Sequence, residues 1–173
     1  MASFKQSATL LVLVLGTCFG PVADTAPAPD GVSQPSIGVV TQIRPPDLSS
    51  LSPRIEEPTY RAFRNRNDLK DYWNFLLERT PGAPPPMPEI DFSTSILIMA
   101  AVGERPYGGY SVHFSTYIES ADRILVSVED RQPGALCLLP AQVSYPVAFG
   151  TIPKTAKVID FQITNVVTTC SRS

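Results

Sequence analysis

Hydrophobic and polar residues alternate over several stretches of this chain, a pattern typical of β-strands with one buried face. The alternation is clearest at 110–114 and 124–128, where aromatic or β-branched residues occupy every second position. The run 96–102 is apolar at every position, as in a central strand covered on both faces. We therefore expect a sheet whose central strand lies in 96–102.

Two shorter stretches near the start of the chain extend this sheet. Residues 37–43 form a β-branched run that Pro45 and Pro46 bring to an end, which predicts a first strand. Residues 58–64 alternate more weakly and fit an edge strand.

The C-terminal half predicts two further strands. Residues 143–152 have an extended, β-rich composition, and Pro146 within them favours an edge strand or a bulge. In 158–167, Ile159, Phe161 and Ile163 alternate with polar residues, which predicts a last strand with one buried face.

A change of period to helical spacing predicts one amphipathic helix. Asn67 is a suitable N-cap, and the helix is expected to end near Arg79. Trp73 is expected to anchor the helix to the sheet. The apolar positions recur at i, i+3, i+4, i+7 and i+8, a spacing that favours core packing over a ligand site: Leu69, Tyr72, Trp73, Leu76 and Leu77.

The elements together predict a mainly β fold with one helix, in the α+β class. We expect a curled antiparallel sheet, as a small barrel or a sandwich, covered by the amphipathic helix. One β-rich domain is expected over 37–167, followed by a polar tail over 168–173.

The N-terminus predicts export. Lys5 precedes a short apolar stretch that is too short to span a bilayer, so 1–17 is expected to be a signal peptide. Leu15-Gly16-Thr17-Cys18 resembles a lipobox, in which Cys18 becomes the acylated N-terminus, and ordinary secretion is the alternative. Residues 18–36 are rich in proline and polar residues, which predicts a flexible tether.

Export also changes the expectation for the cysteines. If Cys18 is lipidated, Cys137 and Cys170 are the remaining thiols, and an oxidising compartment favours a bond between them. The alternative is two free thiols, because cysteines whose Cα atoms are more than about 7 Å apart cannot bridge.

Composition excludes several classes of function. The formal net charge is −2 with mixed signs, so no continuous basic surface is expected and no nucleic-acid partner. His113 is the single histidine, and it lies in an alternating strand, which favours a surface or packing role over catalysis.

Metal and hydrolytic sites are not expected either. One histidine and two separated cysteines do not make a tetrahedral metal site. Three carboxylate pairs lie where solvation explains them better than a glycosidase pair does: Glu89 with Asp91, Glu119 with Asp122, and Glu129 with Asp130. The sequence predicts no catalytic residue, no metal and no cofactor, and points to binding rather than turnover.

The segment after the predicted central strand is the candidate binding site. Pro106 fixes its own φ, and Gly108 and Gly109 allow positive φ, so the chain can reverse there. A plain hairpin connection and an exposed binding loop are both consistent with this composition. The binding hypothesis assigns the contact to seven residues: Glu104, Arg105, Pro106, Tyr107, Gly108, Gly109 and Tyr110.

Several short segments together resemble the C-terminal domain family of the protease complex subunit PrcB. The segment 103–110, which reads Gly-Glu-Arg-Pro-Tyr-Gly-Gly-Tyr, is the most specific. It follows Ile-Glu-Glu-Pro at 55–58 and Pro-Glu-Ile-Asp-Phe-Ser at 88–93, and it precedes Ile-Pro-Lys at 152–154. The resemblance implies a non-catalytic, extracytoplasmic accessory domain, a subunit or stabiliser of a surface or secreted protease complex.

Two other functions remain open at this point. Pro106-Tyr107-Gly108-Gly109-Tyr110 is similar to a loop of chagasin-type peptidase inhibitors, which implies inhibition of a cysteine peptidase. A structural lipoprotein of the cell envelope is the further alternative. In each case we expect a periplasmic, secreted or membrane-anchored protein, which touches the membrane only through a lipid anchor and has a protein partner.

Overall fold

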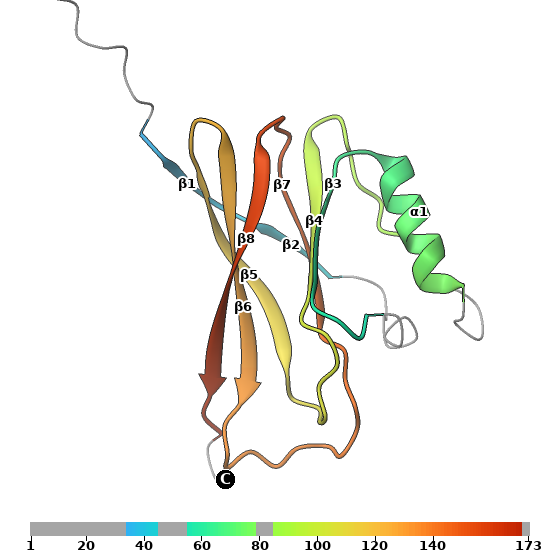
Figure 1. Cartoon of the computed structure of the whole chain (residues 1–173), viewed down its shortest axis with the longest axis vertical. Coiled ribbons are helices and arrows are strands. Elements are labelled where there is room, and N and C mark those ends of the chain that lie inside the picture. Colours follow the sequence, from blue (N-terminus) through green and yellow to red (C-terminus); the bar gives the residue numbers. More distant parts are fainter. Residues whose placement is uncertain (1–33, 45–54, 79–84, 171–173) are drawn as a thin grey trace, which may run out of the picture. The chain divides into compact units, whose positions relative to one another are not determined.

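The computed structural model describes residues 34–44, 55–78 and 85–170, which form two four-stranded sheets and one helix (Figure 1). The predicted mainly β fold with one helix is confirmed, and the two sheets form a sandwich. The predicted signal peptide, Cys18 and nearly all of the tether lie outside the described residues.

The two sheets take their strands from alternating parts of the chain. Sheet A has the order β1 (Ser36–Val39), β5 (Ser111–Glu119), β6 (Arg123–Pro133) and β8 (Val158–Thr168). Sheet B has the order β2 (Thr41–Ile43), β7 (Val147–Pro153), β4 (Ser95–Ala101) and β3 (Thr59–Phe63). The helix α1 spans Arg66–Leu77.

Strand β4 has an apolar layer on each of its faces. Its even-numbered side chains, such as Ile96 and Ile98, join the core between the sheets. Its odd-numbered side chains, such as Leu97 and Met99, join a second core under the helix. Because successive side chains of a strand point to opposite faces, a strand buried on both sides must be apolar throughout. The prediction of a central, doubly covered strand at 96–102 is confirmed.

The helix α1 packs on the outer face of sheet B. Leu69, Trp73 and Leu76 are its buried residues, and the Trp73 ring lies 6.3 Å from the ring of Phe149 in β7. The Trp73 Nε1–H also donates to the Pro85 carbonyl oxygen at 3.2 Å. The predicted role of Trp73 as the anchor between helix and sheet is therefore confirmed.

The N-cap of α1 is Asn65, so the prediction of Asn67 was wrong by two residues. The Asn65 side-chain oxygen accepts from the Asp68 N–H at 2.9 Å, while Asn65 Nδ2 donates to the Asp68 carboxylate at 2.7 Å. These two reciprocal hydrogen bonds satisfy one of the backbone donors at the start of the helix. Asp68 lies in the first turn, where a negative charge is favourable.

We expect Asn65→Ala to lower the free energy of unfolding by about 1 kcal/mol, because it removes the cap of α1. Asn67→Ala is the matched control. Asn67 lies inside the helix and alanine has the higher helix propensity, so its effect should be neutral or slightly stabilising. Urea denaturation of the two variants measures the difference, and equal losses would contradict this assignment of the cap.

Two details of the strands differ from the sequence predictions. The run 37–43 breaks at Val40 into β1 and β2, which belong to different sheets, because the buried Val40 side chain enters the core at the crossing point. Pro146 marks neither an edge nor a bulge. It precedes β7, which is central in sheet B, and its carbonyl oxygen accepts from the Val102 N–H at 3.3 Å.

The last strand also departs from the expected antiparallel order. Strand β8 runs parallel to β6, since the chain passes through sheet B as β7 before it returns (Figure 1). Ile159 and Phe161 pack against the core between the sheets. The prediction that Ile163 is buried with them was wrong: Ile163 lies farther along this edge strand and is 41% exposed.

Candidate functional site

The predicted binding segment crosses from one sheet to the other and is not a hairpin. It leaves β4 in sheet B and enters β5 in sheet A, and these strands have different neighbours. Gly103 and Gly109 have positive φ, at 80° and 87°, whereas Gly108 does not. A Cβ on Gly103 would lie 2.7 Å from the Glu56 carbonyl oxygen, so both backbone angle and space require glycine there.

The connection between β6 and β7 holds this segment in place. Arg105 and Ser144 form an isolated bridge, with N–H to carbonyl oxygen distances of 2.8 and 3.0 Å. The Gly108 N–H donates to the Pro140 carbonyl oxygen at 3.1 Å, and the Ser144 hydroxyl donates to the Tyr107 carbonyl oxygen at 2.7 Å. The segments 103–110 and 134–146 therefore form one unit at one end of the sandwich, which we call the tip (Figure 1).

A side-chain contact joins the same two segments. The Tyr145 hydroxyl donates to a Glu104 carboxylate oxygen at 2.9 Å. This hydrogen bond raises the pKa of Tyr145 above its ordinary value, because it favours the protonated phenol. Glu104 remains exposed and thus has a partner within the tip.

Arg105 points into the sandwich. Its guanidinium donates to Asp130 at 2.6 Å, and the Asp130 side chain is 5% exposed while that of Arg105 is 25% exposed. Arg105 Nε and Asp130 Oδ1 are both buried without a hydrogen-bond partner among the described residues. The expectation that this segment presents Arg105 to solvent was therefore wrong, because the buried carboxylate of Asp130 draws the guanidinium inward.

The remaining predicted residues divide by exposure. Glu104, Pro106, Tyr107 and Gly109 are exposed, whereas Gly108 and Tyr110 are half-buried. The Tyr110 ring centroid lies 5.7 Å from the Arg105 guanidinium carbon. Tyr107 is the large apolar surface that this segment offers, with 49% of its area exposed.

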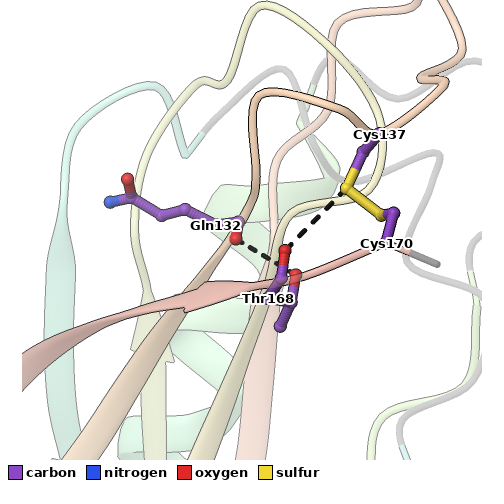
Figure 2. Close-up of a disulfide and its surroundings, with 4 residues drawn as sticks. All are labelled: Gln132, Cys137, Thr168 and Cys170. Carbon is purple, nitrogen blue, oxygen red and sulfur yellow. Dashed lines mark hydrogen bonds between the residues drawn. A yellow bond between two sulfur atoms is a disulfide. The ribbon is translucent and has the colours of Figure 1, made fainter.

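A disulfide bond fixes the other segment of the tip. Cys137 and Cys170 are bonded, with their Cα atoms 5.2 Å apart (Figure 2). Next to the bond, the Gly134 N–H donates to the Thr168 carbonyl oxygen at 2.9 Å, and the Thr168 hydroxyl donates to the Gln132 carbonyl oxygen at 3.1 Å. The loop after β6 is therefore fastened to the end of β8.

The disulfide-held segment exposes apolar side chains that sequence reasoning missed. Leu136 is 68% exposed and Leu138 is fully exposed, and these two leucines flank Cys137. Val143, in the same segment, is 47% exposed. The sequence feature that could have indicated this surface is the apolar run Leu-Cys-Leu-Leu at 136–139, between Pro133-Gly134 and Pro140. Such a run in a loop too short to bury it marks an exposed apolar surface.

In the structure, His113 and Glu129 each have a partner on their own strand. The His113 Nε2 lies 3.1 Å from the Ser111 hydroxyl, and His113 is half-buried in β5. Glu129 bonds Arg131 at 2.8 Å, while its neighbour Asp130 points to the opposite face of β6. Within the described residues, no group of three or more potential ligands could hold a metal ion.

Three carboxylates of the other two pairs also have local contacts. Asp91 accepts from the Ser93 side chain and from the Ser93 N–H, and these bonds lower the pKa of Asp91. Glu119 forms an ion pair with Lys157 at 2.8 Å, and Asp122 lies 3.8 Å from Arg123.

A separate groove follows the outer edge of β3. It is open, has a volume of about 620 Å³ and is lined by Pro58, Thr59, Tyr60, Arg61, Ala62, Phe63 and Asp68. None of its lining residues belongs to the tip.

Among the described residues, no helix is long and apolar enough to cross a membrane.

The chain was compared with protein-family models, with curated proteins and with solved structures, and none of them matches it.

Proposed function

We propose that this chain is a non-catalytic, extracytoplasmic binding domain whose tip contacts a protein partner. The observation that carries this proposal is the set of exposed apolar side chains on the tip, Tyr107, Leu136, Leu138 and Val143. Exposed apolar side chains gathered on one part of a surface favour an interaction site.

The rigidity of the tip supports the same proposal. One disulfide and several hydrogen bonds join the segments 103–110 and 134–146 to each other and to β8. A loop that is already held in one conformation loses less entropy when it binds. The tip is therefore better suited to recognition than an unrestrained loop of the same composition.

The proposed partner is a surface or secreted protease complex. This part of the proposal rests on the predicted signal peptide and on the resemblance of 103–110 to the PrcB C-terminal domain family. A disulfide between Cys137 and Cys170 fits an oxidising, extracytoplasmic compartment.

Affinity capture from envelope fractions tests this function. We expect Tyr107→Ala and Leu138→Asp each to reduce partner recovery about tenfold or more. Tyrosine is enriched among the residues that dominate a binding energy, and an aspartate at position 138 would place an unpaired charge in an apolar contact. Ile37→Asp is the matched control, since Ile37 is also exposed but lies on β1, outside the tip. Unchanged recovery with both tip variants would remove the tip from the proposed function.

A second measurement distinguishes a binding subunit from an inhibitor. A papain-like peptidase is assayed with increasing amounts of the wild-type chain. Inhibition that depends on dose and is lost in Tyr107→Ala would replace the accessory role by the chagasin-like one. Full peptidase activity at every dose agrees with the accessory role.

A further inference from the structure

Strand β8 offers the longest open edge among the described strands. It is 11 residues long and ends sheet A, whereas the edge strands β1, β2 and β3 have 4, 3 and 5 residues. An open edge presents backbone donors and acceptors to any strand that can align with it. Soluble proteins usually protect such edges with proline, lysine or a bulge.

The direction of the free backbone groups follows from the register with β6. The Val158 N–H donates to the Asp122 carbonyl oxygen, and the Thr168 carbonyl oxygen accepts from the Gly134 N–H, so the even-numbered residues face β6. In a strand the N–H and C=O of one residue point to the same side. The odd-numbered residues therefore direct these groups away from the sheet: Ile159, Phe161, Ile163, Asn165 and Val167.

The side chains of β8 leave this edge unprotected. The strand contains neither proline nor lysine, and its one charged residue, Asp160, is paired with Arg123 at 3.2 Å. Ile163 and Val167 are 41% and 66% exposed. These two residues lie on the inner side of the sheet but are not part of the core between the sheets, so they would gain from an apolar neighbour.

Both ends of β8 are held, which keeps the edge extended. At its start, Lys157 forms an ion pair with Glu119 and also donates to the Ser120 carbonyl oxygen. Just beyond its end, the disulfide between Cys137 and Cys170 fastens the chain. A strand that is already ordered adds a partner strand at a lower entropy cost.

We propose that β8 pairs antiparallel with β8 of a second copy of this chain, about a twofold axis at Ile163. In this register Ile163 faces Ile163 of the other copy, Phe161 faces Asn165, and Ile159 faces Val167. It is the one symmetric register that pairs all five outward-facing residues. Each such pair exchanges two backbone hydrogen bonds, so the edge forms about ten, the number found in a typical interface.

The same register is favourable for the side chains. The exposed Ile163 packs against its own symmetry mate, and the exposed Val167 packs against Ile159. Asp160 faces Val166, so no like charges are opposed across the pair. This self-complementarity favours a second copy as the occupant over an unrelated peptide. The pairing would join the two copies of sheet A into one continuous sheet.

Sedimentation equilibrium of the full chain over a concentration series tests this pairing. The wild type is expected to show twice the monomer mass. Ile163→Lys is expected to raise the dimer dissociation constant about tenfold or more, since it opposes two ammonium groups at the axis. Ile37→Lys, on the opposite edge of sheet A, should leave the dimer intact. The proposal would be overturned if the wild type is a monomer at every concentration. It would also be overturned if the Ile163→Lys variant dimerises like the wild type.

A cross-linking experiment tests the register itself, in a Cys18→Ser background. Facing residues of a hydrogen-bonded pair have their Cα atoms about 5.5 Å apart, within the range of a disulfide. Ile163→Cys alone should therefore form a covalent dimer on a non-reducing gel. Asn165→Cys alone should not, because its symmetry mate lies farther along the strand. No dimer with Ile163→Cys, or an equal yield with Asn165→Cys, would overturn the register. An unchanged thermal melt of each variant shows that the fold is retained.

Discussion

Arg105→Ala is expected to lower the free energy of unfolding by about 3 kcal/mol, although Arg105 lies in an outer connection between strands. The reason is Asp130, whose side chain is 5% exposed and would lose its cationic partner. A buried charge left without a partner costs several kcal/mol, and we take the low end because the Arg105 side chain keeps 25% of its area exposed. Urea denaturation of the wild type and the variant measures this loss.

The double variant Arg105→Ala with Asp130→Asn is the control for this explanation. It removes both charges, so it should recover a large part of the stability that the single variant loses. If the double variant is as unstable as Arg105→Ala, the loss comes from packing and the ion pair is not its cause. This result also matters for binding studies, since Arg105→Ala can reduce partner recovery by disordering the tip.

The sequence predicted the parts of the fold that depend on local pattern. The unbroken apolar run of β4 indicates two covered faces, and the spacing of Leu69, Trp73 and Leu76 indicates a helix with one buried side. In both cases the burial of each side chain follows from the period of the element. The covered faces of β4 and the buried side of α1 can therefore be predicted from the sequence alone.

Strand partners are a different matter, since they depend on contacts between distant residues. A glycine-rich connection after β4 is compatible with a hairpin and with a crossing between sheets, and the structure has the crossing. Similarly, the alternation in β8 indicates a strand but does not reveal that β6 is its parallel neighbour. Neighbour order arises from how the sheets pack as a whole, which no short pattern contains.

The candidate site also combines features that follow from local sequence with features that depend on contacts between distant residues. The sequence predicted the exposure of Tyr107 and the positive φ of Gly109, because turn chemistry is local. It also proposed positive φ for Gly108, whereas the second glycine with positive φ in 103–110 is Gly103. It did not indicate that Arg105 faces Asp130, which is 25 residues away in the chain. Nor did it single out Leu138, whose full exposure depends on how the disulfide holds the loop.

Removing the disulfide is expected to cost about 3 to 4 kcal/mol of stability, because the bond closes a long loop in the unfolded chain. Cys137 and Cys170 are separated by 33 residues, and this loop includes β7 and β8. The double variant Cys137→Ser with Cys170→Ser leaves the unfolded chain free to explore many more conformations. Urea denaturation of the variant and of the oxidised wild type gives the difference.

A reductant provides the matched control for the disulfide. Reduction should bring the wild type to the stability of the double serine variant, and it should leave that variant unchanged. The loss should also be visible locally, as faster hydrogen exchange in 134–146, because the fastening to the end of β8 is lost. Equal stability of the oxidised and reduced wild type would contradict a stabilising bond. The fixed conformation of the tip would then depend on its hydrogen bonds, among them those of Arg105, Gly108, Ser144 and Tyr145.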